Sequence, residues 1–214
     1  GLGGYQFDRY RKPTRAPARL ALDVAAADLS EAYAQLKASL LVRDLVNTPT
    51  EDMGPDQLEA VAFRLAKAYG GEARSITGEA LLSENFPAIH AVGRASHRAP
   101  RLIELVWGDP AHKLLAICGK GVCFDAGGLD IKPADGMRWM KKDMGGAAHA
   151  LALAQLVMAQ KLPVRLHLLV PAVENAIAAN AYRPGEVIAT RKGLRVEVDN
   201  TDAEGRIVLC DALA

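Results

Sequence analysis

Acidic and basic residues alternate in the segment Asn200-Thr201-Asp202-Ala203-Glu204-Gly205-Arg206. If the segment is extended or turning, Asp202, Glu204 and Arg206 project toward the same side. Two carboxylates held so close are costly unless a cation lies between them. A string of this kind also occurs in solvated strands and turns. On its own it leaves both a metal site and an ordinary surface segment open.

Three motifs upstream also place charged residues among glycines and apolar residues. In chain order they are GKGVCFDAGG, which contains Lys120 and Asp125; IKP, which contains Lys132; and MKKDMGG, which contains Asp143. The acids Asp125, Asp143, Asp202 and Glu204 cannot pack together as free anions, because like charges raise one another's pKa. Two divalent cations would relieve that repulsion, and a carboxylate-dominated set suits zinc, manganese or magnesium. We therefore expect these acids and Lys120 to form a two-metal site.

Length and composition limit the function classes. The 214 residues, half of them hydrophobic, suffice for one large domain or two small ones. The 26 basic and 25 acidic residues give a formal net charge of +1, which provides no electrostatic basis for binding nucleic acid or an acidic membrane. Three cysteines without a C-x-x-C pair fit neither a disulfide framework nor a cysteine zinc site. With no apolar run of about 18 residues and no signal-peptide pattern, we expect a cytoplasmic protein without a membrane partner.

Two helices are expected near the start of the chain. Ser30 is a candidate N-cap for a helix with apolar residues at intervals of three and four, which ends near residues 47–49. Pro55 opens a second helix that runs to about Tyr69 and is closed by glycines. A basic, proline-containing stretch over residues 9–19 precedes both helices and is typical of a linker.

Strands and helices alternate over the rest of the chain. Residues 101–107 and 113–118 are short apolar runs at hairpin distance, and residues 164–172 form another strand. A helix is expected over residues 145–160 and a second hairpin over residues 187–198. This pattern predicts an α/β fold with a central, mostly parallel or mixed sheet flanked by helices. The charged motifs then lie at strand ends, where open α/β sheets bind their ligands.

The strings GKGVCFDAGG, IKP, MKKDMGGAA and NTDAEGR, in this order, resemble the leucyl (cytosol) aminopeptidase family of two-metal exopeptidases. The resemblance implies that Asp125 and Glu204 bridge the two metals. It also implies that Asp202 completes the more exchangeable site and that Lys120 and Asp143 complete the tighter one. A lysine binds a metal only when neutral, and two adjacent dications would lower its pKa.

The resemblance also implies catalytic roles for Lys132 and Arg206. Lys132 would polarise the scissile carbonyl and stabilise the oxyanion of the tetrahedral intermediate. Arg206 would hold a bicarbonate ion that acts as general base toward a water molecule between the metals. Met140 would line the pocket for the first side chain of the substrate. The implied reaction is hydrolysis of an N-terminal leucine or other apolar residue from peptides, with two Zn²⁺ or Mn²⁺ ions, or Mg²⁺, and bicarbonate as cofactors.

The family's organisation implies how the chain is divided. Residues 1–28 would be the end of an N-terminal domain and a linker, and residues 29–214 the first portion of the catalytic domain, so we expect the chain to be a fragment. The full-length protein would be a homohexamer. The chain departs from the family's pattern at Cys123, Ala126 and His149, none of which is a ligand position.

Three alternative functions compete with this interpretation. A phosphate-binding loop at Gly119-Lys120-Gly121 is disfavoured, because the Walker pattern requires Ser or Thr after its lysine. A cysteine hydrolase is disfavoured, because no histidine is suggested as a partner for Cys118 or Cys123. The third alternative is a non-catalytic relative that binds DNA or has a structural role. Metal content and release of leucine from a chromogenic leucyl amide would separate it from the enzyme.

Overall fold

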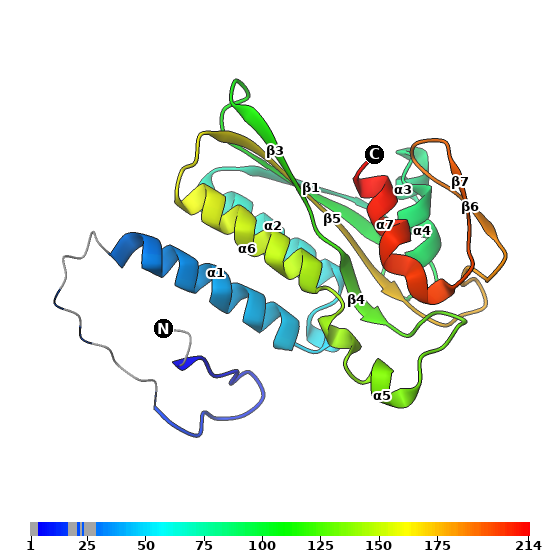
Figure 1. Cartoon of the computed structure of the whole chain (residues 1–214), viewed down its shortest axis with the longest axis horizontal. Coiled ribbons are helices and arrows are strands. Elements are labelled where there is room, and N and C mark those ends of the chain that lie inside the picture. The colour runs from blue at the N-terminus through cyan, green and yellow to red at the C-terminus, as the bar shows by residue number, and fades with distance from the viewer. Residues whose placement is uncertain (1–3, 17–20, 22, 24–28) are drawn as a thin grey trace.

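The computed structural model describes residues 4–16, 21, 23 and 29–214. At its centre is a mixed sheet with the strand order β1-β2-β5-β3, and β4 also pairs with β5. The expected α/β fold, with a mixed sheet flanked by helices, is therefore confirmed (Figure 1). The strands of this sheet are β1 (Glu72–Thr77), β2 (Arg101–Trp107), β3 (Lys113–Cys118), β4 (Gly121–Asp125) and β5 (Val164–Asn175).

The long strand β5 organises the sheet. It pairs antiparallel with β2 on one edge and parallel with β3 and β4 on the other. β3 and β4 follow one another along that edge, because Cys118 lies opposite Leu169 and Gly121 lies opposite Ala172. The strands expected over residues 101–107 and 113–118 are correct, but the hairpin between them is wrong. β5 lies between the two, and its residues 170–173 are buried on both faces, as suits a central position.

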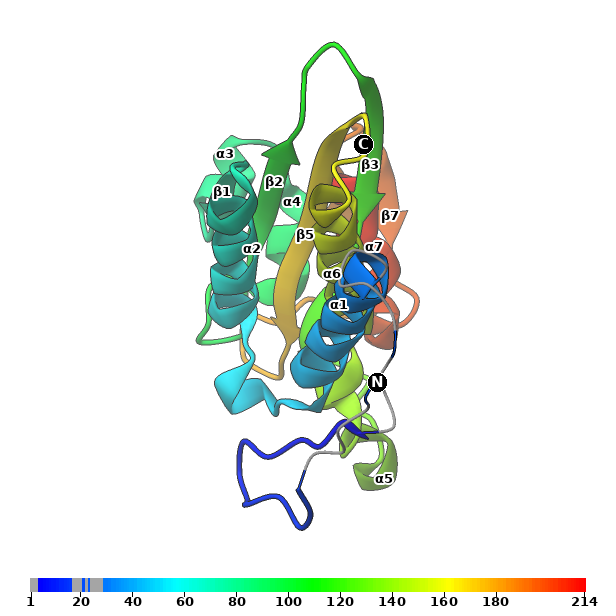
Figure 2. The same ribbon diagram turned by 90° about the vertical axis from the view of Figure 1, so that its left-hand side faces the viewer.

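Helices cover both faces of the sheet. α2 and α6 pack on one face with α1 outside α6, and α4 and α7 pack on the other (Figure 2). Each face has its own apolar cluster, the first around Leu58 and Leu151 and the second around Ile89 and Val208. The helices are α1 (Ser30–Asn47), α2 (Pro55–Tyr69), α3 (Ala80–Ser83), α4 (Pro87–Gly93), α5 (Ala134–Met137), α6 (Gly145–Ala159) and α7 (Glu204–Ala212).

Local signals determine most of the expected element ends. α2 begins at Pro55, and its C-terminal cap, Gly70, adopts a left-handed φ of 71°. α6 fills its expected range, and β6 (Val187–Ala189) and β7 (Arg195–Glu197) form the expected hairpin. The expectation that Ser30 caps α1 is wrong. Ser30 is already the first residue of the helix, so Leu29 occupies the N-cap position, and no side-chain hydrogen bond caps the helix there.

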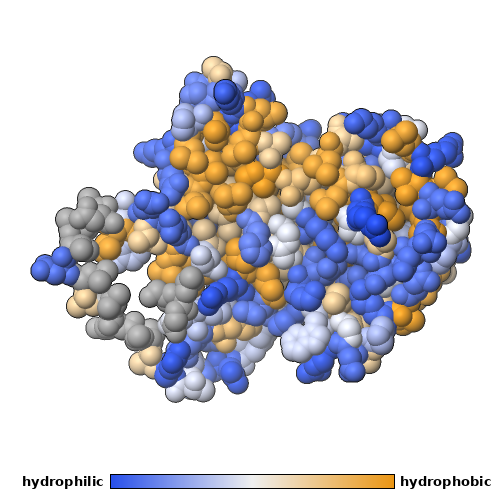
Figure 3. All heavy atoms as spheres, in the orientation of Figure 1, coloured by the Kyte–Doolittle hydropathy of each residue, from blue (hydrophilic) through white to orange (hydrophobic). Residues whose placement is uncertain are grey.

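Two peripheral features complete the fold. The N-terminal segment lies against the end of α1, where the Tyr5 hydroxyl donates a hydrogen bond to Asp44 Oδ1 at 2.8 Å. Residues 17–19 of the expected linker lie outside the described residues. Figure 3 shows apolar residues gathered over β3, and Leu114 of this strand is 63% exposed. Among the described residues, no helix has both the length and the apolar character needed to cross a membrane.

Candidate metal centre

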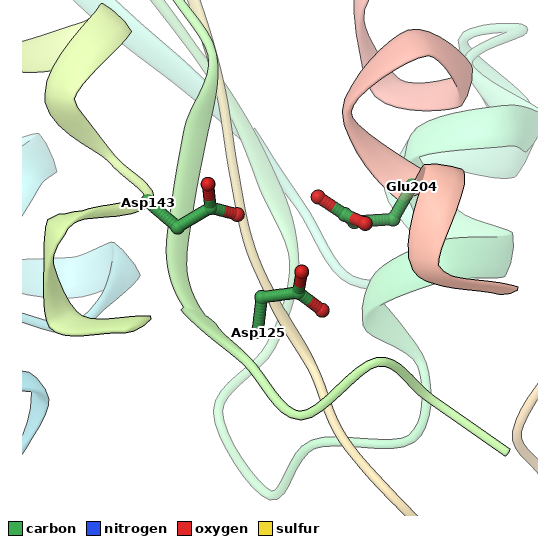
Figure 4. A group of neighbouring side chains, drawn as sticks. All are labelled: Asp125, Asp143 and Glu204. Carbon is green, nitrogen blue, oxygen red and sulfur yellow. The ribbon is translucent and has the colours of Figure 1, made fainter. Parts of the chain in front are cut away.

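Three chain segments bring together two buried carboxylates and one partly buried carboxylate at the end of β4. Asp125 is the last residue of β4, Asp143 follows the 3-10 turn Met140–Lys142, and Glu204 is the first residue of α7. One carboxylate oxygen from each acid lies within 4.8 Å of the other two. Figure 4 shows the three side chains pointing toward a common space. Asp125 and Glu204 are only 2% and 1% exposed, so their charges require partners.

Lys120 enters this space from the break between β3 and β4. The backbone on either side of the break stays bonded, since Gly119 N donates to Leu169 O at 3.0 Å and Lys120 O accepts from Ala147 N at 2.8 Å. The ammonium Nζ lies 2.8 Å from Asp143 Oδ2 and 2.7 Å from Glu204 Oε1. The absence of a side chain at position 205 makes room for it, because a Cβ on Gly205 would lie 2.8 Å from Lys120 Nζ.

Lys132 supplies a second ammonium group, next to a fourth carboxylate. Its Nζ lies 3.0 Å from Asp125 Oδ2 and is also paired with Asp202 Oδ1. The loop after β4 folds back to place it there, since Lys132 N donates to Ala126 O at 2.9 Å. Each lysine therefore lies between two carboxylates from different segments.

Burial and neighbouring charges shift the pKa values of the site. Burial raises the pKa of Glu204 to about 7, with Lys120 opposing the shift and Asp125 and Asp143 adding to it. Burial lowers the pKa of Lys120, but its hydrogen bonds and ion pairs with Asp143 and Glu204 outweigh this, and the net shift is upward. The pKa of Lys132 is raised by the same balance, through Asp202 and Asp125. In this arrangement both lysines are ammonium ions.

The donor set fits divalent cations. Four carboxylates face two ammonium groups, so full ionisation leaves an excess of negative charge. Glu204 Oε2 is buried and accepts no hydrogen bond from any described residue, which is costly for a carboxylate oxygen without a cation. Oxygen donors of this kind, with one amine, suit Zn²⁺, Mn²⁺ or Mg²⁺.

The segment 200–206 is helical rather than extended. Thr201–Ala203 form a 3-10 turn, and α7 begins at Glu204. The expectation that Asp202, Glu204 and Arg206 point to the same side is therefore wrong, because residues two apart in a helix face away from one another. The turn still brings both carboxylates to the two lysines.

Three residues named from the sequence lie outside this network of ion pairs. Arg206 is exposed, and within the part of the chain that the structure describes it forms no hydrogen bond or ion pair. Met140 is half-buried at the start of the 3-10 turn that precedes Asp143. His149 is exposed, and its Nδ1 lies 2.7 Å from Gly145 O within its own helix.

Polar residues that were not predicted from the sequence lie behind the acids. Asn175 Nδ2 donates a hydrogen bond to Asp125 Oδ1 at 2.8 Å. The Tyr182 hydroxyl donates to Thr201 O, and Asp130 Oδ2 accepts from Thr201 N at 2.8 Å. One signal could have identified Asn175: it is a polar residue at the end of an apolar strand, where α/β sheets place their sites.

Comparison with known proteins adds a family assignment to this geometry. The profile of the cytosol aminopeptidase family, catalytic domain, matches residues 40–214. The probable cytosol aminopeptidase of Syntrophotalea carbinolica is 41% identical over 227 residues, which cover 99% of this chain and 46% of that protein. The chain thus spans about half the length of the curated relatives it matches.

Solved structures agree with the family profile and the sequence relatives. Cytosol aminopeptidase from Coxiella burnetii is similar with a TM-score of 0.94 and 53% identity, over 99% of this chain and 46% of that one. The bottromycin maturation enzyme BotP in complex with Mn has a TM-score of 0.91 and 36% identity, over the same shares of the two chains, 99% and 46%. Because the family profile covers most of the sequence and these structures cover nearly all of it, the chain belongs to the cytosol aminopeptidase family.

Proposed function

We propose that this chain is part of a metal-dependent aminopeptidase, which hydrolyses the N-terminal residue from peptides. The observation that carries the proposal is the cluster of four carboxylates and two lysines, joined by ion pairs between separate segments. Membership of the cytosol aminopeptidase family supports the same activity. Since the chain spans about half the length of its curated relatives, the proposal concerns the full-length protein that contains it.

The proposed metal ligands are the acids of the cluster and one lysine. They would hold two divalent cations: Asp125 and Glu204 would be shared by the two ions, Asp202 would complete the more exchangeable site, and Lys120 with Asp143 would complete the tighter one. The buried, unpartnered oxygen of Glu204 supports this assignment among the described residues. The relative BotP was solved with Mn, and the donor set suits Mn²⁺ and Zn²⁺. Such cations would supply Lewis acidity and lower the pKa of a water nucleophile.

Lys132 is proposed as the group that stabilises the oxyanion. Its raised pKa keeps the side chain charged at neutral pH. Its ion pairs with Asp125 and Asp202 hold the ammonium beside the proposed ligands, where it can donate a hydrogen bond to the carbonyl oxygen of a peptide. Arg206 is proposed to hold bicarbonate, the general base, because its exposed guanidinium suits a planar oxyanion.

The finer properties of the enzyme are also proposals. Met140 lines the pocket for the first side chain and favours leucine or another apolar residue. Residues 1–28 end an N-terminal domain, and residues 29–214 begin the catalytic domain. The full-length protein is a cytoplasmic homohexamer. Leucyl aminopeptidase from Trypanosoma brucei was solved in complex with bestatin, which makes bestatin a suitable probe.

Activity and metal content of the full-length protein test the proposal together. We expect release of leucine from a chromogenic leucyl amide, loss of that activity after chelation, and recovery when Mn²⁺ is added back. Bestatin should inhibit the metal-loaded protein. Metal-loaded protein without turnover on any leucyl substrate would contradict the proposal and favour the non-catalytic, DNA-binding or structural alternative.

Two variants separate the roles of the lysines near the site. Lys132→Met should lower kcat by about 100- to 1000-fold, the usual effect of removing an oxyanion donor, while the metal content stays at the parental level. Lys142→Met is the matched control, because Lys142 is exposed and forms no ion pair within the described part of the chain. Unchanged turnover in Lys132→Met would rule out the proposed role.

A further inference from the structure

We propose that Asn175 is a positioning residue for the metal centre. Its buried side-chain amide holds the Asp125 carboxylate and the segment that carries Asp202 and Glu204 at a fixed separation. The inference rests on the proposed metal-dependent function and adds a residue that is itself no ligand.

The backbone places Asn175 beside a proposed metal ligand. Asn175 ends β5 and lies opposite Asp125 in the parallel pairing of β4 with β5. Just beyond that pair, Ala126 N donates a hydrogen bond to Asn175 O at 3.0 Å. The side chain is 1% exposed, so solvent cannot replace its hydrogen bonds.

The Asn175 amide donates hydrogen bonds to two acceptors from different segments. Nδ2 donates to Asp125 Oδ1 at 2.8 Å and to Thr201 O at 3.0 Å. Gly127 N donates to the same Asp125 oxygen at 2.8 Å. The Oδ1 oxygen is therefore anchored by two donors, and Oδ2 is left to face the site, where it meets Lys132. Asn175 thus fixes the rotation of the carboxylate.

Thr201 is the other end of the link. It is fully buried and immediately precedes Asp202. Its carbonyl also accepts from the Tyr182 hydroxyl, its N donates to Asp130 Oδ2 at 2.8 Å, and its hydroxyl donates to Gly127 O at 2.6 Å. Contacts from three segments therefore fix the residue from which the 3-10 turn and α7 begin. Among these contacts, Gly127 joins Thr201 to Asp125 through its backbone, and Asn175 joins them through a side chain.

Donor character, and not only size, is what position 175 requires. Oδ1 of Asn175 accepts no hydrogen bond from the described residues, whereas Nδ2 faces two acceptors. Little space remains around the amide, since a Cβ on Gly128 would lie 3.0 Å from Asn175 Oδ1 and 2.9 Å from Thr201 Oγ1. An aspartate of the same shape would turn an oxygen toward the Asp125 carboxylate and the Thr201 carbonyl, and would repel both.

The experiment compares Asn175→Asp with Asn180→Asp in the full-length protein. Asn180 is a matched control, because it lies on the chain just after β5 and its exposed amide donates to Arg94 O, at 2.8 Å, and to no other described residue. Calorimetric titration of metal-stripped protein with Mn²⁺ should give a Kd about 10- to 100-fold higher in Asn175→Asp, the usual effect of losing an outer partner of a ligand. Asn180→Asp should bind Mn²⁺ with the parental Kd.

The outcomes separate positioning from general stability. A lower Tm of the metal-stripped Asn175→Asp protein together with a parental Kd would show a merely structural role and overturn the inference. If that variant does not fold, Asn175→Ala, which removes the donor without adding a charge, carries the test, with Asn180→Ala as its control. Loss of the hydrogen bonds from Nδ2 should raise the Kd about two- to tenfold, and a parental Kd would overturn the inference. A parent protein that binds no Mn²⁺ would overturn the proposed function and this inference together.

Discussion

Raising the pH should destabilise the metal-free protein through Glu204. The side chain is 1% exposed, and burial, opposed by Lys120 and reinforced by Asp125 and Asp143, raises its pKa from 4.5 to about 7. In the unfolded chain the same carboxyl group has its ordinary pKa. Between these two values the folded protein binds more protons than the unfolded protein, so folding becomes less favourable as the pH rises. The stabilising contribution is complete below the unfolded pKa and is lost as the pH rises through the folded one.

The size of the effect follows from the shift. Each pH unit well inside the window changes the free energy of unfolding by about 1.4 kcal/mol. With a folded pKa of about 7, moving from about pH 6 to about pH 8 crosses the upper end of the window. The Glu204 contribution to the free energy of unfolding should then fall by about 1.4 kcal/mol.

Urea unfolding of the metal-stripped full-length protein measures this contribution. The parent and Glu204→Gln are compared at both pH values, because the amide cannot titrate and other titrating groups cancel in the difference. Glu197→Gln, on the exposed strand β7, is the control and should behave like the parent. The reasoning would be refuted if the free energy of unfolding had the same pH dependence in the parent and in Glu204→Gln. It would also be refuted if raising the pH stabilised the parent relative to Glu204→Gln.

Three further predictions follow from individual contacts. Asp211→Ala should lower the free energy of unfolding by about 3 kcal/mol in urea, because Asp211 Oδ2 is a buried acceptor for Ala88 N at 2.7 Å and Ile89 N at 3.3 Å, at the start of α4; a loss below about 0.5 kcal/mol would contradict it. Gly205→Ala should leave the circular dichroism spectrum unchanged and weaken Mn²⁺ binding at least about tenfold, since the added methyl group displaces only the flexible end of Lys120. At about pH 8, Mn²⁺ binding to the parent should release about one proton more than Mn²⁺ binding to Lys120→Met, because an amine coordinates a metal only after losing its proton. Calorimetry in buffers of different ionisation enthalpy measures the number of protons released. Equal release from the two proteins would exclude Lys120 as a ligand.

The elements of the fold were predictable where local chemistry determines them. Pro55 and Gly70 mark the ends of α2, because one suits the first helical turn and the other the left-handed cap. Strand pairing was not predictable in this way. The runs at residues 101–107 and 113–118 are adjacent in sequence, but β5 pairs with both only after the chain has formed β4 and α6. The order of strands depends on which faces pack against helices, and a short apolar run does not indicate which helix its faces will contact.

The site was predictable in its members but not in its arrangement. The motifs identified Lys120, Asp125, Asp143 and Glu204, and the structure brings these four together. The roles assigned to them stay predictions. The expectation that alternate residues of an extended or turning segment face one side is wrong here, because a 3-10 turn and then a helix start in this segment. Asn175 was missed because its uncharged side chain donates a hydrogen bond to Asp125, which no charge pattern reveals.

The two lysines explain how four carboxylates can share this space in the folded chain. Lys120 joins Asp143 to Glu204, and Lys132 joins Asp125 to Asp202. Each ammonium thus links acids from different segments, so the pairs offset the repulsion between the acids and also hold those segments together. The ion pairs therefore gather the acids around one space. Because the two lysines compensate only part of the negative charge, the same assembly retains an attraction for divalent cations, which is what a preorganised metal site requires.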